Sequence, residues 1–350
     1  MKGRWSLVGS AVLVPASGVA AVFHSAPARF GLAAAALVPL AGLLGDATED
    51  LAAHAGPRLG GLLNATFGNA AELIVGIFLV ARGELAVVRA SITGSIIGNL
   101  LLVLGAAFFA GGVRHKELDF SASSASAGIS SMALAVAGIL MPSIYAHGQH
   151  TTEFRIETVS VGVAIVLLLL YGASLAFAFI THPEAVAPPT EGEEPALSVR
   201  GALVVLAIAG ALVAFESELL VGALEKTVEA ANLSRIWVGL IVVPIVGNAA
   251  EHSTAVRAAV KRKTDLAVSI AVGSSAQVAL VVTPILVFAG LALGHHLTLD
   301  FTPFDISAMA VAVIVVAFVA YDGRTNWLEG AQLLGVYGIL AVASFYLGRR

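Results

Sequence analysis

The sequence contains no cysteine among its 350 residues. Disulfide bonds, thiolate metal sites and thiol catalysis are therefore excluded. Charge is also scarce, because Asp, Glu, Lys and Arg make up 12% of the chain, against about 25% in a typical soluble protein. The net charge of −4, with basic residues confined to short loops, gives no basis for nucleic-acid binding. None of the nine histidines begins a His-Glu-x-x-His motif, so we predict neither an intramembrane metalloenzyme nor a bound cofactor.

Hydrophobic residues, in contrast, are abundant. They make up 58% of the chain, and the mean hydropathy is +0.92. Apolar runs of roughly 18 residues, enough to cross a hydrocarbon core of ~30 Å, recur along the sequence. The period-2 alternation of a membrane barrel is absent. We therefore predict an all-α integral membrane protein with eleven transmembrane helices, at residues 6–24, 30–53, 62–81, 86–111, 124–147, 157–181, 199–223, 233–260, 264–291, 302–320 and 328–347.

The orientation follows from the basic residues. Lys2 and Arg4 precede an apolar run that resembles a signal peptide, but the many spans that follow favour an uncleaved first helix. With the N-terminus inside, eleven Lys and Arg lie on inner segments and eight on outer ones. The positive-inside rule then favours an N-terminus inside and a C-terminus outside. The sequence leaves the oligomeric state open, and a homo-oligomer is compatible with it.

One five-residue block occurs twice. Gly68-Asn69-Ala70-Ala71-Glu72 is identical to Gly247-Asn248-Ala249-Ala250-Glu251, which lies 179 positions later (68 to 247). A Gly-Ser pair shows the same offset, at Gly94-Ser95 and Gly273-Ser274 (94 to 273). Upstream of these blocks, residues 48–51 resemble residues 217–220, at a slightly different offset. We interpret the chain as two related halves.

The halves are separated by a polar stretch. Residues 182–198 hold four Glu and several prolines but no Lys or Arg, and they read as a solvated linker; a calcium-sensing role for these carboxylates is the alternative. We therefore divide the chain into a first transmembrane helix (1–26), repeat 1 (27–181, five helices), the acidic, proline-rich linker (182–198) and repeat 2 (199–350, five helices). The two repeated blocks fall in the third and eighth predicted spans, so they cross the membrane in opposite directions. Such inverted repeats are typical of secondary transporters, whose substrate sites lie near the midplane.

Each repeated block carries a carboxylate inside an apolar segment. A charge at the bilayer centre costs at least about 2.5–3.5 kcal/mol, which makes Glu72 and Glu251 functional-site candidates. Each shares a helix face with an Asn three residues earlier, Asn69 or Asn248. The preceding glycine, Gly68 or Gly247, permits close packing or a local unwinding that frees carbonyl oxygens. Carboxylate, amide and carbonyl oxygens are calcium ligands, and two Glu match the ion's charge.

Further polar side chains follow each block. The small hydroxyl residues Ser95 and Ser274 line the site or serve as packing devices between helices. Asn99 and Gln277, further along the same spans, supply amide oxygens, although they are not equivalent positions. The predicted cation ligands are therefore Gly68, Asn69, Glu72, Ser95, Asn99, Gly247, Asn248, Glu251, Ser274 and Gln277.

Two other acidic residues are candidates for proton coupling. A carboxyl group in an apolar setting can exchange protons near neutral pH. Glu218 lies deep in the seventh predicted span. Glu49 lies near a helix end beside Asp46 and Asp50, where facing interfacial water is the alternative. A structural ion pair is the alternative role for Glu72 and Glu251, but the third predicted span contains no Lys or Arg.

At these residues the sequence resembles the calcium/proton exchangers, the cation/proton branch of the calcium:cation antiporter superfamily. The matching segments cover essentially the whole chain after the first helix, and they are LLNATFGNAAELIVGIF from Leu62, SITGSIIGNLLLVLG from Ser91, VGNAAEHSTAV from Val246, SIAVGSSAQVAL from Ser269 and PLAGLLGDATEDLA from Pro39. Sodium/calcium exchangers share the repeat architecture, but GNAAEH with its GSSAQ continuation resembles the proton-coupled branch.

The resemblance implies a first helix outside two inverted five-helix repeats, and Ca²⁺ carried as a substrate against H⁺. Carried over, Glu72 and Glu251 bind the ion, while Glu49 and Glu218 lie on mobile helices that gate access and take part in proton coupling. Eukaryotic members often carry a long N-terminal extension and a strongly acidic helix between the halves. This chain has only a short acidic linker, which favours a bacterial protein in the cytoplasmic membrane and leaves regulation by the linker open.

We expect alternating access, in which Ca²⁺ and protons compete for Glu72 and Glu251. Sodium-coupled calcium exchange is the nearest alternative, and a channel is a further one. The sequence leaves open the stoichiometry, affinity, transport direction and selectivity against Mn²⁺ or Cd²⁺.

Overall fold

The computed structural model describes residues 4–22, 25–148, 152–177, 180 and 195–347. Helices dominate these residues, and they are α1 (Arg4–Val22), α2 (Ala26–Phe67), α3 (Ala70–Ala81), α4 (Leu85–Ile97), α5 (Leu104–His115), α6 (Ala122–Gly148), α7 (Glu153–Ala176), α8 (Val199–Ala230), α9 (Arg235–Trp237), α10 (Val243–Gly247), α11 (Ala249–Val260), α12 (Thr264–Gln277), α13 (Thr283–Leu293), α14 (Pro303–Val319) and α15 (Trp327–Tyr346). Three π-helical segments join neighbouring helices: η1 (Gly98–Val103), η4 (Val238–Val242) and η5 (Val278–Val282).

The helices agree with the predicted spans in position but not all in length. Within the described residues, seven helical stretches are long and apolar enough to cross a membrane. The number is eight if the helix pair Arg235–Gly247 and Ala249–Val260, which is bent by 63°, forms one span. Three predicted spans correspond to shorter apolar helices, at Trp5–Ala20, Ala70–Ala81 and Pro303–Val319. The membrane-spanning helical class is thus observed, whereas eleven crossings remain a prediction.

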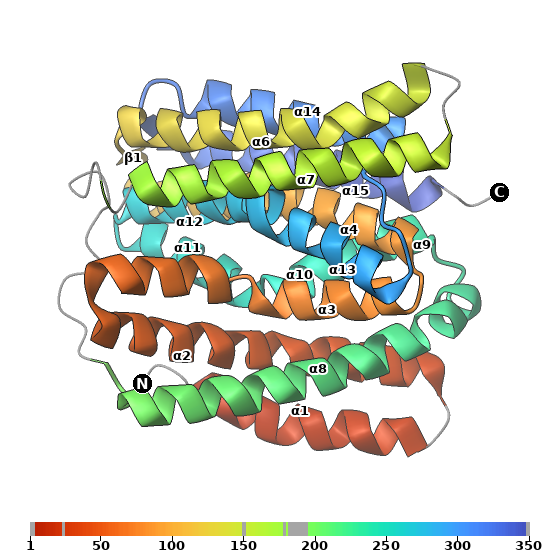
Figure 1. Cartoon of the computed structure of the whole chain (residues 1–350). Coiled ribbons are helices and arrows are strands. Elements are labelled where there is room, and N and C mark those ends of the chain that lie inside the picture. The colour runs from red at the N-terminus through yellow and green to blue at the C-terminus, as the bar shows by residue number, and fades with distance from the viewer. Residues whose placement is uncertain (1–3, 23–24, 149–151, 178–179, 181–194, 348–350) are drawn as a thin grey trace. The chain divides into compact units, whose positions relative to one another are not determined.

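The chain falls into two compact units, and each takes residues from both predicted halves. The first unit comprises Met1–Phe78, Leu168–Asn232 and Val246–Ala250. Its helices α1, α2 and α8 lie side by side, with α2 packed along α8 and α1 packed along α2 (Figure 1). The carboxylate of Asp50 accepts hydrogen bonds from the backbone N–H groups of Ala196 (3.0 Å) and Leu197 (3.1 Å), which fixes the chain entering α8.

The second unit comprises Leu79–Leu167, Leu233–Ile245 and Glu251–Arg350. In it α5 packs against α15, α4 against η4, and α12 and α14 against α6. The close approach of α4 and η4 depends on Gly94, since an added Cβ would lie 2.0 Å from the carbonyl oxygen of Leu240. This glycine, singled out from the repeated Gly-Ser pair, therefore serves helix packing.

A small sheet is a departure from the all-α expectation. Strands β1 (Glu117–Asp119) and β2 (Arg324–Asn326) pair antiparallel, with Leu118 opposite Thr325. Each strand has three residues, too short for a period-2 pattern to reveal it in the sequence. The sheet joins the chain after α5 to the chain before α15, so it closes the end of that helix pair.

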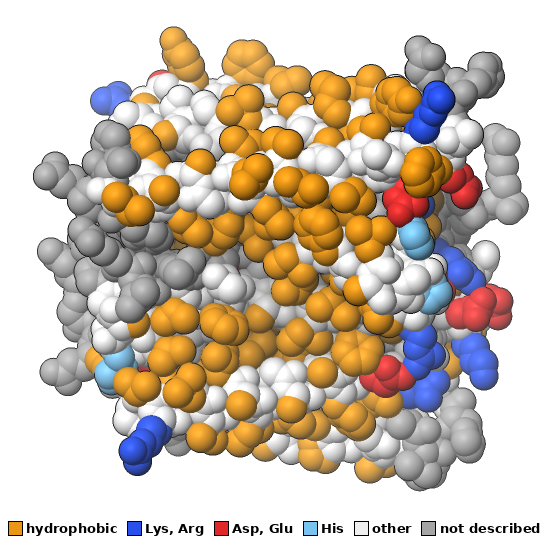
Figure 2. All heavy atoms as spheres, viewed as in Figure 1, with side chains coloured by type: hydrophobic (Ala, Val, Ile, Leu, Met, Phe, Trp, Pro, Cys, Tyr) orange, Lys and Arg blue, Asp and Glu red, His pale blue; other side chains and the backbone are white. Residues whose placement is uncertain are grey.

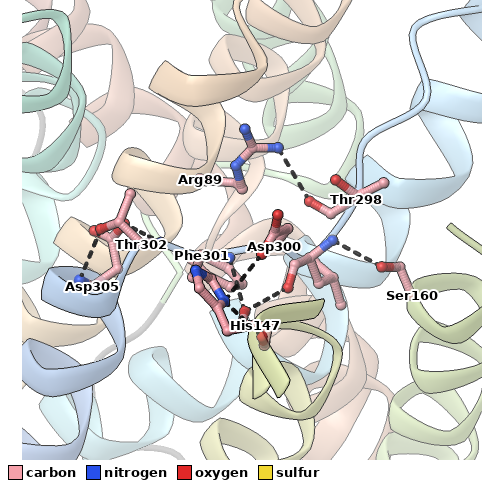
Figure 3. Close-up of polar contacts among 10 residues, drawn as sticks. Arg89, His147, Ser160, Thr298, Asp300, Phe301, Thr302 and Asp305 are labelled. Atoms are coloured by element: carbon pink, nitrogen blue, oxygen red, sulfur yellow. Dashed lines mark hydrogen bonds and ion pairs between the residues drawn. The ribbon is translucent and has the colours of Figure 1, made fainter. Parts of the chain in front are cut away.

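The extended segment between α13 and α14, at residues 295–302, is held by side chains of the helices around it (Figure 3). The hydroxyl of Ser143 on α6 donates to the carbonyl oxygen of Leu299 (2.8 Å) and accepts from the N–H of Phe301 (2.8 Å). Ser160 on α7 accepts from the N–H of Leu299 at 2.9 Å. Arg89 on α4 donates to the carbonyl of Thr298 at 3.3 Å. Backbone groups that lie outside any helix are satisfied in this way.

The outer faces of the helices are apolar. Exposed large hydrophobic side chains recur along α7 and α8, among them Leu169, Leu203 and Ile208. In Figure 2, hydrophobic side chains cover the sides of the helices in view, and Asp, Glu, Lys and Arg gather near helix ends. Helices of this kind are suited to lipid contact.

The predicted division into a first helix, two repeats and a linker remains a prediction. Most of the linker, residues 182–194, lies outside the described residues.

We predict that Ser143→Ala lowers the stability of the folded protein. Ser143 is completely buried, and its loss leaves a buried carbonyl and a buried N–H without partners, at about 1–3 kcal/mol each. The measurement is the thermal unfolding midpoint in detergent micelles. The control is Ser131→Ala on the same helix, because Ser131 is exposed and bonds only the carbonyl of Ala127. Equal midpoints for the two variants would contradict the assigned role of Ser143.

Candidate functional site

Both copies of the repeated block lie where a helix is interrupted. Gly68 and Asn69 form a turn between α2 and α3, and Asn248 forms the break between α10 and α11. The helix direction changes by 63° across the second break. The local unwinding expected beside the glycines is therefore present, and interrupted helices leave backbone groups available to a ligand.

Each interruption also places a glutamate in the first turn of the following helix, Glu72 in α3 and Glu251 in α11. The unpaired N–H groups and the dipole at a helix N-terminus favour a negative charge there. Repeated sequence thus produces the same local electrostatics twice.

In the first unit, Glu72 meets the second copy of the block. Its Oε1 accepts a hydrogen bond from the side-chain amide of Asn248. Gly247 lies so close that an added Cβ would be 2.8 Å from Cγ of Glu72. Asn69 is buried in the same unit. Five predicted ligands therefore belong to one unit: Gly68, Asn69 and Glu72 from the first copy, and Gly247 and Asn248 from the second.

In the second unit, Glu251 meets the helix that carries the second Gly-Ser pair. The hydroxyl of Ser274 on α12 donates to Oε2 of Glu251 at 2.5 Å, and Ser274 itself is buried. This contact places the hydroxyl of Ser274 beside a candidate ligand, and its role in an ion site remains a prediction.

The remaining predicted ligands of the second unit lie beside π-helical turns. Asn99 is the second residue of η1, and Gln277 directly precedes η5. Asn99 is 1% exposed, and its amide oxygen and nitrogen have no hydrogen-bond partner among the described residues. Buried amides are nearly always bonded in proteins, and π-helical turns are frequent at functional sites. Ser95 is buried one turn before Asn99.

The acidic residues expected to gate access are exposed, unlike most of the predicted ligands. Glu49 on α2 and Glu218 on α8 are both exposed in the first unit. Glu216, which sequence analysis did not single out, is instead completely buried. The sequence pattern does not separate the two glutamates, because Glu218 also has apolar residues three positions away on its face, Phe215 and Val221.

Each unit holds a carboxylate beside a neutral amide or hydroxyl group, and Ca²⁺ accepts oxygen ligands of these kinds. No group of three or more His, Cys, Asp or Glu that could hold a metal occurs in the part of the chain that the structure describes.

Comparison with known proteins places this arrangement in a family. Residues 25–180 and 201–346 match the sodium/calcium exchanger protein family. A Ca²⁺/H⁺ antiporter of Synechocystis sp. is 45% identical over 342 residues, which cover 91% of this chain and 90% of that protein. The Ca²⁺/H⁺ antiporter ChaA of Bacillus subtilis is 41% identical over 342 residues, covering 95% of this chain and 97% of that protein.

The fold agrees with the sequence relationship. The solved structure of native YfkE superimposes with a TM-score of 0.86 at 36% identity, and covers 98% of this chain and 100% of that one. YfkE is described as a Ca²⁺/H⁺ antiporter. The chain therefore belongs to the sodium/calcium exchanger protein family, in its branch of calcium/proton exchangers.

Proposed function

We propose that this protein is a secondary active transporter that exchanges Ca²⁺ for H⁺ across a membrane. One observation carries the proposal: a glutamate stands in the first turn of a helix after each of two identical interrupted blocks, and each glutamate accepts a hydrogen bond from a neutral donor. The relatives from Synechocystis and Bacillus subtilis carry the name Ca²⁺/H⁺ antiporter, which supports the choice of ions.

Competition between Ca²⁺ and protons for Glu72 and Glu251 couples the two fluxes. With both carboxylates ionised, a bound Ca²⁺ is neutralised. With both protonated, the empty carrier is neutral as well. An empty carrier with two charges would have to move them through an apolar core, which is costly. Each unit of pH difference supplies about 1.36 kcal/mol per proton. Two protons per Ca²⁺ make the exchange electroneutral, and a third, through Glu49 or Glu218, makes it electrogenic.

The neutral partners have a role in both states. When no cation is bound, the amide of Asn248 and the hydroxyl of Ser274 stabilise the carboxylates by donating hydrogen bonds. When Ca²⁺ is bound, the same side chains turn their oxygens to the ion, together with Asn69, Ser95, Asn99, Gln277 and the carbonyls of Gly68 and Gly247. Asn99 supports this view, because its buried amide has no partner among the described residues.

The architecture that we propose is a first helix followed by two inverted repeats of five helices, with alternating access to the ion. Glu49 and Glu218 would lie on the helices that gate this access. We place the protein in a bacterial cytoplasmic membrane with its N-terminus inside. Bacterial relatives support the membrane assignment.

Neutralising either central carboxylate should abolish exchange. We expect Glu72→Gln and Glu251→Gln to lose Ca²⁺ uptake into vesicles with an imposed pH gradient, because an amide carries neither the proton nor the charge. The control is Glu117→Gln, at an exposed position of β1. Undiminished uptake by either central variant would falsify the proposal. Uptake that needs a sodium gradient and ignores a proton ionophore would instead favour sodium coupling, and single-channel currents would favour a channel.

The two neighbouring serines of α12 allow a finer test. We expect Ser274→Ala to weaken the apparent Ca²⁺ affinity about tenfold, which corresponds to about 1.4 kcal/mol, because the variant lacks the hydroxyl oxygen that turns to the bound ion. Ser275→Ala is the matched control, because the hydroxyl of Ser275 donates to the carbonyl of Ala271 at 3.0 Å. The measurement is the Ca²⁺ concentration at half-maximal uptake. A larger effect at Ser275 than at Ser274 would remove Ser274 from the ligand set.

A further inference from the structure

One carboxyl group in the first unit has no part in the exchange described above. Glu216 lies in the middle of α8 and is 0% exposed. Its Oε1 is 2.6 Å from the hydroxyl oxygen of Ser17, a residue of α1 that precedes it by 199 positions. Its Oε2 is buried and has no hydrogen-bond partner among the described residues. The contact joins α1 directly to α8.

The hydrogens available to this contact indicate the form of the carboxyl group. The hydroxyl oxygen of Ser17 lies 2.8 Å from the carbonyl oxygen of Val14 and 2.6 Å from Oε1 of Glu216. A serine hydroxyl has one hydrogen, so it can donate to only one of these acceptors. If it donates to Val14, the second close contact between two oxygens requires a hydrogen from Glu216. A protonated carboxyl group satisfies both contacts.

The charges around Glu216 do not replace that proton. On α8, the basic residues nearest in sequence are Lys226 and Arg200, 10 and 16 positions away (226 and 200 against 216), or about 15 Å and 24 Å along a helix. The described part of α1 from Trp5 onward holds no ionisable side chain.

On α2, Arg29 is the basic residue nearest to the height of Ser17 along the helix axis. Helices α1 and α2 run antiparallel, with Ser6 against Gly42 and Gly9 against Pro39. If this register continues, Ser17 lies beside the turn that follows Arg29. Within the described residues, Arg29 makes no ion pair with Glu216. The other ionisable residues of α2 with described side chains lie toward its opposite end: Asp46, Glu49, Asp50 and His54.

We propose that Glu216 is a proton-binding site between α1 and α8, separate from Glu72 and Glu251. The bound proton keeps the two helices together through the Ser17 contact. When it leaves to water, a carboxylate remains between apolar helices without a cation, which is unfavourable, and α8 moves away from α1. The effect on transport rests on the proposed exchange, whereas the presence of the proton does not.

Infrared spectroscopy of the full-length protein in lipid vesicles tests the proton itself. At neutral pH and with saturating Ca²⁺, which keeps Glu72 and Glu251 ionised in the proposed exchange, we expect the carbonyl stretching band of a protonated carboxyl group, sensitive to exchange into heavy water. We expect Glu216→Gln to lose this band. Glu225→Gln, an exposed glutamate of the same helix, should retain the band. Ser17→Ala should shift the band without removing it, because one hydrogen bond is lost. Loss of carboxylate bands alone in Glu216→Gln would overturn the proposal.

The pH dependence of Ca²⁺ uptake tests the consequence. Uptake by the unchanged protein should fall at alkaline pH as Glu216 loses its proton. Glu216→Gln, which resembles the protonated form, should lose that fall. An unchanged profile would refute the coupling of Glu216 to transport while leaving the proposed exchange intact. If instead neither protein exchanges Ca²⁺ for H⁺, the proposed function fails, and the infrared band still reports on the proton of Glu216.

Discussion

A carboxylate inside an apolar helical protein needs hydrogen-bond donors, a cation or a proton, and the structure depends on how this need is met. At Glu72 the donor is the amide of Asn248, and at Glu251 it is the hydroxyl of Ser274. Both of these partners are neutral donors. In the exchange that we propose, carboxylates bonded by such donors accept a divalent cation or a proton in turn.

The interrupted helices make this arrangement possible. A continuous helix satisfies its own backbone and presents only side chains, whereas a break exposes N–H and carbonyl groups and creates a new N-terminus. The breaks at Gly68-Asn69 and Asn248 place each glutamate in a first turn, where the helix dipole favours its charge. Small residues are needed where a backbone meets close neighbours, as at Gly94 beside the carbonyl oxygen of Leu240 and at Gly247 beside the side chain of Glu72. Packing and ion chemistry therefore impose constraints on the same short motifs.

Sequence reasoning located the apolar helices and, through the duplicated block, the two points where helices are interrupted. It failed where partners come from distant segments. The same reasoning placed Glu218 deep in its span, but the buried carboxyl group of that helix is Glu216. Its burial depends on α1 and Ser17, which lie 199 positions away. The strands at residues 117–119 and 324–326 were missed for a similar reason, since only their pairing defines them.

The sequence by itself determined the membrane-spanning helical class, the duplicated acidic motifs and the family, because composition, apolar run length and identical blocks are properties of the chain alone. The tertiary structure decided which groups meet: Asn248 with Glu72, Ser274 with Glu251, and Ser17 with Glu216. Hydrogen bonds act over about 3 Å, and no local pattern fixes contacts of that range between residues far apart in the chain.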